Sequence, residues 1–505
     1  MKSFPLSLVA GVVALAAVTG FAAVNAPGDP APAAAGATSR LPVERSSLLC
    51  PTPSGSEIAD TVYTSFTPAG KGVDGEAAAE LKPAAVIPAD DAKAPDAKAA
   101  RKAEEKAEKA VVSVKEPGRP VTAEASGGDA PALVGTATGK LAPGWTTQQT
   151  TTVTVGGSRG LLGVGCTAPD TEFWFPGVST AAKRQDYIHL TNPDDTAAVA
   201  DVELFGPEGA LATDVGDGIT VPARSTVQLL VSTLTPAVAE HATAHVTTRS
   251  GRVGAAVGVA EDGAGTDWLT ASADPAAELV MPGIPADASS VQLVAYAPGE
   301  ADADVTVQLL GKNAAFSPAG NATLHIKSGM TATADLKDVT RGEPGSLRLT
   351  PVEKGRSTPV VAALRVTRGT GDEQEIAYIP ATGPVGERST AADNRAKGST
   401  LSLTAPGAAA EVKVTASAGS GGGEPAVKTY SVKAGTTLAV TPQAPAGLKG
   451  SYALTVETES GGPVYASRTL ALPKGGVQMF TVQTLPDDRG LVEVPAARQD
   501  LSVLD

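Results

Sequence analysis

The chain has 505 residues, more than one hydrophobic core serves, and its length predicts three or four domains. Its 55 glycines and 39 prolines favour many short strands and turns over long helices, and aromatic residues make up 4% of the chain. The net charge of −14 disfavours nucleic acid and anionic lipid as partners.

The first residues read as an export signal. Met1, Lys2 and Ser3 precede an apolar run without charge over residues 4–24, long enough to cross a bilayer core of ~30 Å. The short basic start and small-residue exit are typical of a secretory signal. We therefore expect residues 1–26 to be a signal peptide or an uncleaved single membrane anchor. A linker rich in Pro and Ala follows over residues 27–41.

The chain holds two cysteines, Cys50 and Cys166. In an oxidising compartment an even pair far apart in sequence predicts a disulfide that closes a long loop. Two unpaired buried thiols are the alternative. Cys50 is not a lipoprotein cysteine, because leucines and not small residues precede it.

Residues 42–170 read as a degenerate β-domain. Short strands are expected over residues 48–50 and 61–66, and the Ala, Lys and Glu of residues 71–131 indicate a solvated insertion, partly helical or disordered. The stretch 145–166 then predicts a hairpin, with a Thr/Val strand, a Gly-Gly-Ser turn and an apolar strand ending at Cys166.

An internal repeat organises the rest of the chain. The FPG of residues 175–177 recurs as the MPG of 281–283, and VELFG at 202–206 recurs as VQLLG at 307–311. A weaker third copy follows. Alternating strands between Gly, Pro, Asn and Asp turns favour antiparallel, immunoglobulin-like β-sandwiches. The expected fold is all-β, with tandem sandwiches over 171–277, 278–384 and 385–505 behind an N-terminal apolar helix.

No motif in the sequence predicts a catalytic, cofactor or metal site. Ser158 lies in a G-x-S-x-G match, but the nucleophile elbow requires a following helix and an apolar strand follows here. His241 and His245 lack the glutamate of the H-E-x-x-H zinc motif. The acidic turns at 192–195, 214–217 and 261–267 lack the regular spacing of a calcium loop.

Three tryptophans remain as a possible ligand platform. Aromatic faces stack on sugar rings, so Trp145, Trp174 and Trp268 would suit a glycan site if they are exposed. Anchoring in the core or between domains is the interpretation that the sequence favours. The aromatic excess around Phe173, Trp174 and Phe175 is the strongest local signal in the chain.

The segments CTAPDTEFWFPG (166–177) and LTNPDDTAAVADVELFGPEG (190–209) resemble an uncharacterised family of exported proteins from high-GC Gram-positive actinobacteria, known as a domain of unknown function. The resemblance implies an envelope or secreted protein without an assigned activity, and it carries over no catalytic residue.

These observations lead to one hypothesis and one alternative. The hypothesis is a non-enzymatic extracytoplasmic protein, secreted or held in the membrane by its N-terminal segment alone. Its sandwiches would act as a spacer or interaction module, with a cell-wall polymer or envelope protein as partner and no cofactor. The alternative is a module that binds cell-wall glycan through exposed tryptophans.

Overall fold

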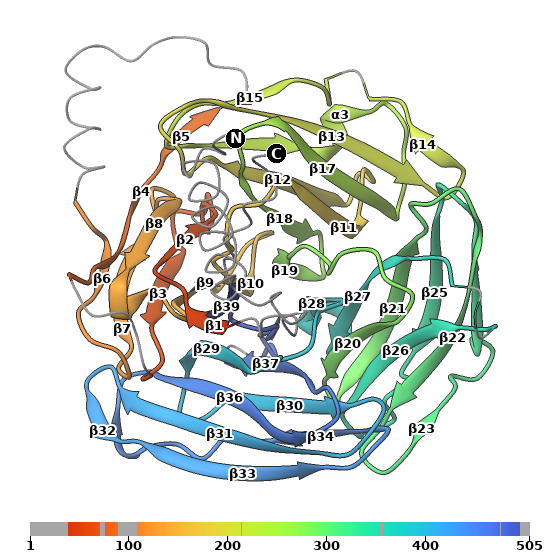
Figure 1. The fold of residues 1–505 in the computed structure, drawn as a ribbon. Helices are drawn as coiled ribbons and strands as arrows, with labels where there is room; N and C mark the ends of the chain where they lie inside the picture. Colours follow the sequence, from red (N-terminus) through yellow and green to blue (C-terminus); the bar gives the residue numbers. More distant parts are fainter. Residues whose placement is uncertain are drawn as a thin grey trace, which may run out of the picture. The chain divides into compact units, whose positions relative to one another are not determined.

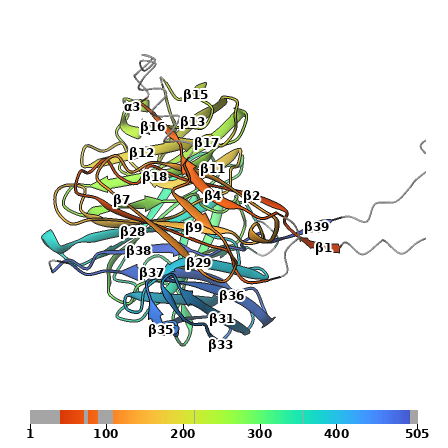
Figure 2. The ribbon, with the colours of Figure 1, turned by 90° about the vertical axis from the view of Figure 1, so that its left-hand side faces the viewer.

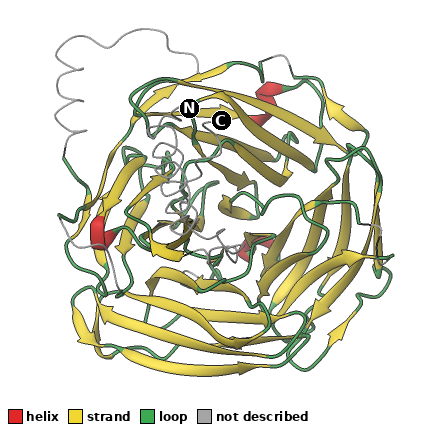
Figure 3. Cartoon of the chain, in the orientation of Figure 1, coloured by secondary structure: helices red, strands yellow, loops and turns green. Residues whose placement is uncertain are grey.

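The computed structural model describes residues 39–494 except 71–75, 89–108 and the single positions 214, 354, 356 and 475. The fold is all-β, as predicted, with 58% of the described residues in strands and 2% in helices. Figure 3 shows the helical segments of this described part as single turns, which are η1 (Gly139–Leu141), α3 (Val231–Leu234) and η2 (Gly371–Glu373). The apolar segment expected over residues 1–26 lies outside the described residues. Among the residues described, no helix has the length and apolarity needed to cross a membrane.

Two compact units are distinguished by their internal contacts. One comprises residues 1–41 and 492–505, and the other comprises residues 42–491. Strands β1 (Ser39–Pro42) and β39 (Leu491–Val494) pair in a separate two-stranded sheet. The described part of the larger unit contains four β-sandwiches.

Sandwich 1 consists of two four-stranded antiparallel sheets around a core that includes Tyr63, Leu81 and Leu133. One sheet has the order β10 (Gly160–Gly165), β9 (Thr146–Val153), β3 (Asp60–Phe66) and β7 (Val121–Ser126). The other has the order β2 (Arg45–Cys50), β8 (Leu133–Thr138), β4 (Ala79–Pro83) and β6 (Val112–Val114).

The expected insertion at 71–131 is therefore too wide. Strands β4, β6 and β7 all lie within it and complete sandwich 1. Their apolar residues Leu81, Val112 and Val114 alternate with polar ones and are at most 2% exposed, a strand pattern hidden by the surrounding Ala, Lys and Glu. The stretch with the highest Lys and Glu content, residues 89–108, lies outside the described residues.

Sandwich 2 follows with two five-stranded sheets. The first has the order β11 (Glu172–Val178), β17 (Ala242–Ser250), β13 (Ala198–Gly206) and β14 (Gly209–Leu211), with β15 (Ile219–Val221) also on β13. The second has the order β19 (Gly265–Leu269), β18 (Gly254–Glu261), β12 (Arg184–Thr191), β16 (Ser225–Leu230) and β5 (Ala85–Pro88). Strand β5 comes from the chain of sandwich 1 and pairs with β16 in parallel.

Sandwiches 3 and 4 complete the unit. One sheet of sandwich 3 has the order β20 (Leu279–Ile284), β26 (Gly345–Pro351), β22 (Ala303–Leu310) and β23 (Ala315–Phe316), with β24 (Thr323–Ile326) also on β22. The other sheet has the order β25 (Thr331–Lys337), β21 (Ala288–Tyr296), β27 (Val361–Arg368) and β28 (Glu375–Pro380). One sheet of sandwich 4 has the order β29 (Arg388–Asn394), β36 (Tyr452–Gly461), β31 (Ala410–Gly419) and β33 (Ala426–Val432). The other sheet has the order β34 (Thr436–Val440), β30 (Ser399–Ala405), β37 (Tyr465–Ala471) and β38 (Phe480–Thr484). Strands β32 (Gly422–Glu424) and β35 (Ala446–Lys449) form a separate two-stranded ribbon.

All four sandwiches share one strand order. If the principal strands of each are counted along the chain, the first pairs with the sixth, the sixth with the third, and the second lies between the fifth and the seventh. The immunoglobulin order instead places the first strand beside the second. The common architecture is thus a repeated antiparallel sandwich whose strand order differs from the immunoglobulin one.

The last strand of each sandwich packs against a neighbouring sandwich. Tyr378 and Ile376 of β28 enter the core of sandwich 2, and Phe480 of β38 enters the core of sandwich 3. Trp268 of β19 packs on sandwich 1, and Leu161 of β10 packs on sandwich 4. Figure 1 shows β10, β19 and β28 next to one another, and Figure 2 shows β28 beside β38. The contacts therefore return from sandwich 4 to sandwich 1.

Close approach of these last strands requires glycine in β10. A Cβ at Gly160 would overlap the backbone oxygen of Thr266, and one at Gly163 would overlap the Thr481 side chain. A Cβ at Gly165 would meet no atom within 4 Å. The interface thus tolerates a side chain at one end of β10 and excludes it at two other positions.

This difference gives a matched pair of variants. Gly160→Ala should destabilise the protein by roughly 1–3 kcal/mol, because the Thr266 carbonyl belongs to the backbone and cannot rotate away. Gly165→Ala, in the same strand, should leave stability nearly unchanged. Urea denaturation followed by tryptophan fluorescence measures both. Equal midpoints for the two variants would contradict the packing described here.

A disulfide closes sandwich 1. Cys50 at the end of β2 is bonded to Cys166 just after β10, with a Cα–Cα distance of 4.4 Å. The two residues are 0% and 8% exposed, and the bridge closes a loop of 116 residues. It ties the first strand of the sandwich to the end of its last strand.

Replacing both cysteines by serine should lower stability by roughly 4–5 kcal/mol on the chain-entropy account of a loop of this length. Denaturation with and without reductant measures the effect. Reductant should shift the midpoint of the wild-type protein and leave the Cys50→Ser, Cys166→Ser variant unchanged. A wild-type midpoint that does not respond to full reduction would refute the prediction.

Candidate functional site

One buried carboxylate lies where the last strands meet. Oδ1 of Asp267 in β19 accepts hydrogen bonds from the Gly163 N–H of β10 (3.1 Å) and from Thr481 Oγ1 of β38 (3.1 Å). Burial raises the pKa of Asp267 well above its usual value. Three sandwiches thus share a single side chain, which is 0% exposed and acts as a connector.

A second buried carboxylate joins sandwiches 1 and 3. Oε1 of Glu375 accepts a hydrogen bond from Arg159 Nε at 3.1 Å, and the same guanidinium donates to the backbone oxygens of Asp372 (2.9 Å) and Gln374 (2.7 Å). Burial raises the pKa of Glu375 to about 7, although Arg159 acts in the opposite direction. The turn between β9 and β10 is thereby fixed to β28.

Sandwiches 4 and 1 are joined by a buried polar network. Arg468 Nη2 donates to Gln148 Oε1 at 2.7 Å, and the N–H of Asp393 donates to the same oxygen at 2.8 Å. Thr150 Oγ1 donates to Asp393 Oδ2 at 2.8 Å. Burial lowers the pKa of Arg468 to about 10. Since a buried polar group costs free energy unless it is hydrogen-bonded, these contacts favour the observed docking of the two sandwiches, while Nε and Nη1 of Arg468 have no hydrogen-bond partner in the described part of the chain.

The aromatic excess of the sequence lies at the junction of sandwiches 2 and 3. Trp174 stacks on His245 with a centroid distance of 3.6 Å and on Tyr296 at 5.5 Å, and Phe205 contacts Tyr296 at 4.7 Å. Trp174 Nε1 donates to Glu172 Oε1 at 3.1 Å. The cluster anchors one sandwich to the next.

The tryptophans offer no platform for a sugar. Trp145, Trp174 and Trp268 are 5%, 6% and 3% exposed, whereas stacking on a sugar ring requires an accessible aromatic face. Trp145 donates to Ser65 Oγ at 2.9 Å inside sandwich 1, and Trp268 packs edge-on against His189. All three serve as core or interface anchors, so the glycan alternative loses its support.

The remaining candidates are separated or already paired. Ser158 lies in the turn of the β9–β10 hairpin, as predicted. His241 contacts Gln292 at 2.9 Å, while His245 lies between Glu172 and Glu203 at 3.0 and 3.2 Å. Among the described residues, no group of three or more His, Cys, Asp or Glu side chains is placed to hold a metal ion.

The acidic turns are likewise engaged by protein groups. Asp194 and Asp195 pair with Arg252 and Arg224 at 3.1 and 2.8 Å. In the turn 261–267, Asp267 is buried as described above. Of the turn 214–217, Asp214 lies outside the described residues, and Asp217 is 3.8 Å from Arg249.

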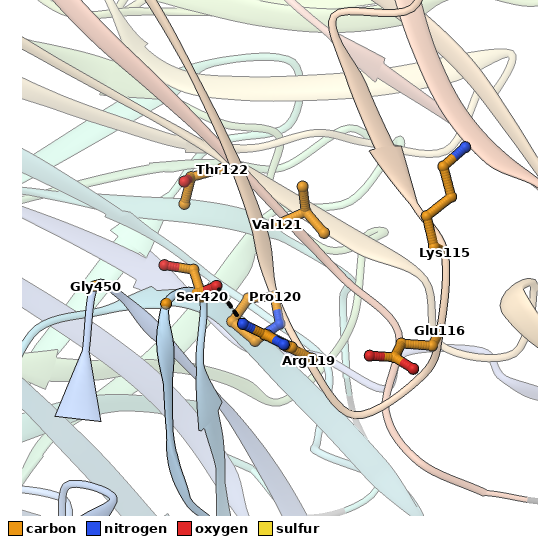
Figure 4. A pocket seen from close by; sticks show the side chains of 9 residues that line it. Lys115, Glu116, Arg119, Pro120, Val121, Thr122, Ser420 and Gly450 are labelled. Atoms are coloured by element: carbon orange, nitrogen blue, oxygen red, sulfur yellow. Dashed lines mark hydrogen bonds between the residues drawn. The ribbon is translucent and has the colours of Figure 1, made fainter. Parts of the chain in front are cut away.

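An open cleft of about 490 Å³ lies between sandwiches 1 and 4. We call it the β7 cleft. Figure 4 shows Arg119 of the β6–β7 turn reaching to Ser420, and its Nη2 donates to the Ser420 backbone oxygen at 3.1 Å. This volume is within the range of small-ligand sites. The lining residues are Lys115, Glu116, Arg119, Pro120, Val121, Thr122, Ser420, Gly421 and Gly450.

The sequence contains no signal for the β7 cleft. Arg119 and Ser420 are 301 residues apart and lie in ordinary turns. Knowledge that sandwich 4 docks on sandwich 1 is needed to bring them together.

Comparison with protein families supplies the chain's identity at the family level. Residues 121–443 match the family of unknown function DUF5719, and the chain belongs to this family. The matched range runs from β7 of sandwich 1 into sandwich 4. No curated protein matches the chain.

The raised pKa of Glu375 predicts a pH dependence of stability. A carboxyl with a folded pKa of about 7 and an unfolded pKa near 4.5 binds more protons when folded. Stability should therefore fall as pH rises between these values, by at most about 3 kcal/mol, and then level off. Glu375→Gln should flatten this part of the profile. Exposed Glu373→Gln is the control, and an equal slope in both variants would contradict the assignment.

Proposed function

We propose that this member of a family of unknown function is a non-enzymatic extracytoplasmic protein whose linked sandwiches act as a rigid interaction module. The buried Cys50–Cys166 disulfide is the observation that carries the location, since such bonds persist in oxidising compartments and are rare in the cytosol. The apolar sequence of residues 4–24 supports the same location.

The contacts between sandwiches favour a module over a spacer. A spacer holds its two ends apart, whereas here sandwich 4 docks on sandwich 1 through Arg468 and Gln148. The ends of the larger unit also meet, because the Val43 N–H donates to the Gly490 oxygen at 3.0 Å. We therefore propose an interaction module in preference to a spacer.

We also propose how the protein is exported, where it acts and what it binds. Residues 1–26 would direct export and either be removed or hold the protein in the membrane, and an actinobacterial envelope would be its setting. The partner would be an envelope protein or cell-wall polymer. The net charge of −14 supports a partner that is neither nucleic acid nor anionic lipid.

Protease protection in intact cells tests this location. A C-terminally tagged protein should be degraded by protease added outside cells from which the wall has been removed, or be recovered in the medium. Its two cysteines should resist alkylation until reductant is added. A cytosolic marker protein is the control. Recovery of the protein in the protected cytosolic fraction with both thiols free would refute the proposal.

A further inference from the structure

The four junctions between sandwiches use the same pair of segments. At each junction, the end of the third strand of one sandwich, or the segment just after it, contacts the start of the fifth strand of the next sandwich or the turn before it. These fifth strands are β16, β25, β34 and β7, which hold the same place in their sheets. Each has a threonine in its first two residues. The junctions can therefore be compared position by position.

Three of these fifth strands are covered at their start. Strand β5 pairs with β16, Thr331 Oγ1 of β25 donates to the Phe205 oxygen at 2.7 Å, and the Thr437 N–H of β34 donates to the Gly311 oxygen at 2.9 Å. The threonines Thr226, Thr331 and Thr437 are 0%, 3% and 1% exposed. Each junction is closed by hydrogen bonds to the preceding sandwich.

The junction of sandwiches 4 and 1 is different. Here Thr122 of β7 is exposed, and the β7 cleft separates Val121 and Thr122 from Ser420 and Gly421. Arg119 reaches Ser420 across this junction. Strand β7 is the edge of its sheet in the described part of the chain, so its outer backbone groups border the cleft.

The protein itself shows what such an edge can hold. At the equivalent place in sandwich 2, the short extended segment β5 runs parallel to β16, with Ala85 opposite Ser225 and Pro88 opposite Gln228. Addition of a strand to an open sheet edge is also a general mode of peptide recognition, in which backbone hydrogen bonds supply affinity.

Charge around the cleft indicates which peptide would fit. Lys115 and Arg119 lie on its wall with one acidic residue, Glu116, in a protein whose net charge is −14. Arg119 has one N–H engaged by Ser420, and a guanidinium has five donors, so a carboxylate can be bound beside it. Because Arg119 precedes β7, the acidic residues of a parallel peptide would precede its extended part.

We propose that the β7 cleft binds an extended peptide segment of a partner protein, with acidic residues at its N-terminal end, by parallel strand addition to β7. This inference rests on the proposed function as an interaction module and names its docking site and partner chemistry.

A labelled heptapeptide provides the probe. Asp-Glu-Ala-Ala-Val-Ile-Pro joins an acidic pair to the sequence of residues 84–88, and Lys-Lys-Ala-Ala-Val-Ile-Pro is its charge-reversed partner. Fluorescence anisotropy with the exported, disulfide-bonded protein measures affinity. Hydrogen exchange measures where the peptide binds. The acidic peptide should bind more tightly and slow amide exchange in residues 121–126, while exchange in residues 225–230 stays unchanged.

Two charge-reversal variants complete the test. Arg119→Glu should weaken the acidic peptide about tenfold, the loss expected for one charge-assisted hydrogen bond, and should strengthen the lysine peptide. Lys397→Glu, at an exposed turn of sandwich 4 outside the cleft, should change neither affinity. Circular dichroism checks that both variants are folded.

Three results would overturn the inference: no binding of the acidic peptide, protection of β16 in place of β7, or equal effects of Arg119→Glu and Lys397→Glu. None of these bears on the protease-protection result. An extracytoplasmic protein that ignores the peptide would retain the proposed function and lose this docking site.

Discussion

The structure depends on the packing of the last strand of each sandwich against a neighbouring sandwich. Tyr378 lies in the core of sandwich 2 and Phe480 in that of sandwich 3, although each belongs to the following sandwich. Neither side chain can become solvated without opening a core it does not belong to. Burial of a large aromatic residue contributes roughly 2–3 kcal/mol, so sandwiches 2, 3 and 4 are coupled in stability as well as in position.

Polar groups decide the geometry that apolar packing leaves open. Hydrophobic contacts are non-directional, and small Ala and Val faces allow neighbouring sheets to slide. Asp267 accepts from two other sandwiches, and Arg468 and Asp393 share the oxygen of Gln148. Each sliding motion would leave one of these buried groups unpaired, at a cost of about 1–3 kcal/mol. The glycines of β10 permit the approach that these hydrogen bonds need.

Local patterns in the sequence predict local structure well. The β9–β10 hairpin follows from its turn residues, and the spacing of FPG and MPG reveals equivalent first strands in β11 and β20. The insertion predicted over residues 71–131 is too wide, because the Ala, Lys and Glu content of this stretch hides the alternation of Leu81, Val112 and Val114 with polar residues. The sequence favours core or interface anchoring for the tryptophans, but it carries no measure of exposure that would exclude a site. Contacts such as Arg119 with Ser420 depend on the docking of sandwich 4 onto sandwich 1, which no local pattern encodes.

Repetition explains why one junction stands apart. Where two consecutive sandwiches dock, a segment of one can pair with an edge strand of the other, as β5 pairs with β16 between sandwiches 1 and 2. The last junction joins sandwich 4 to sandwich 1, so one arrangement of the sandwiches has to satisfy this junction together with the three others. The buried hydrogen bond between Asp393 and Gln148 closes one part of this junction, whereas the edge of β7 at Thr122 is exposed. An open edge invites unspecific pairing unless it is charged or occupied, and the Lys and Arg beside β7 both discourage neutral strands and select an acidic one.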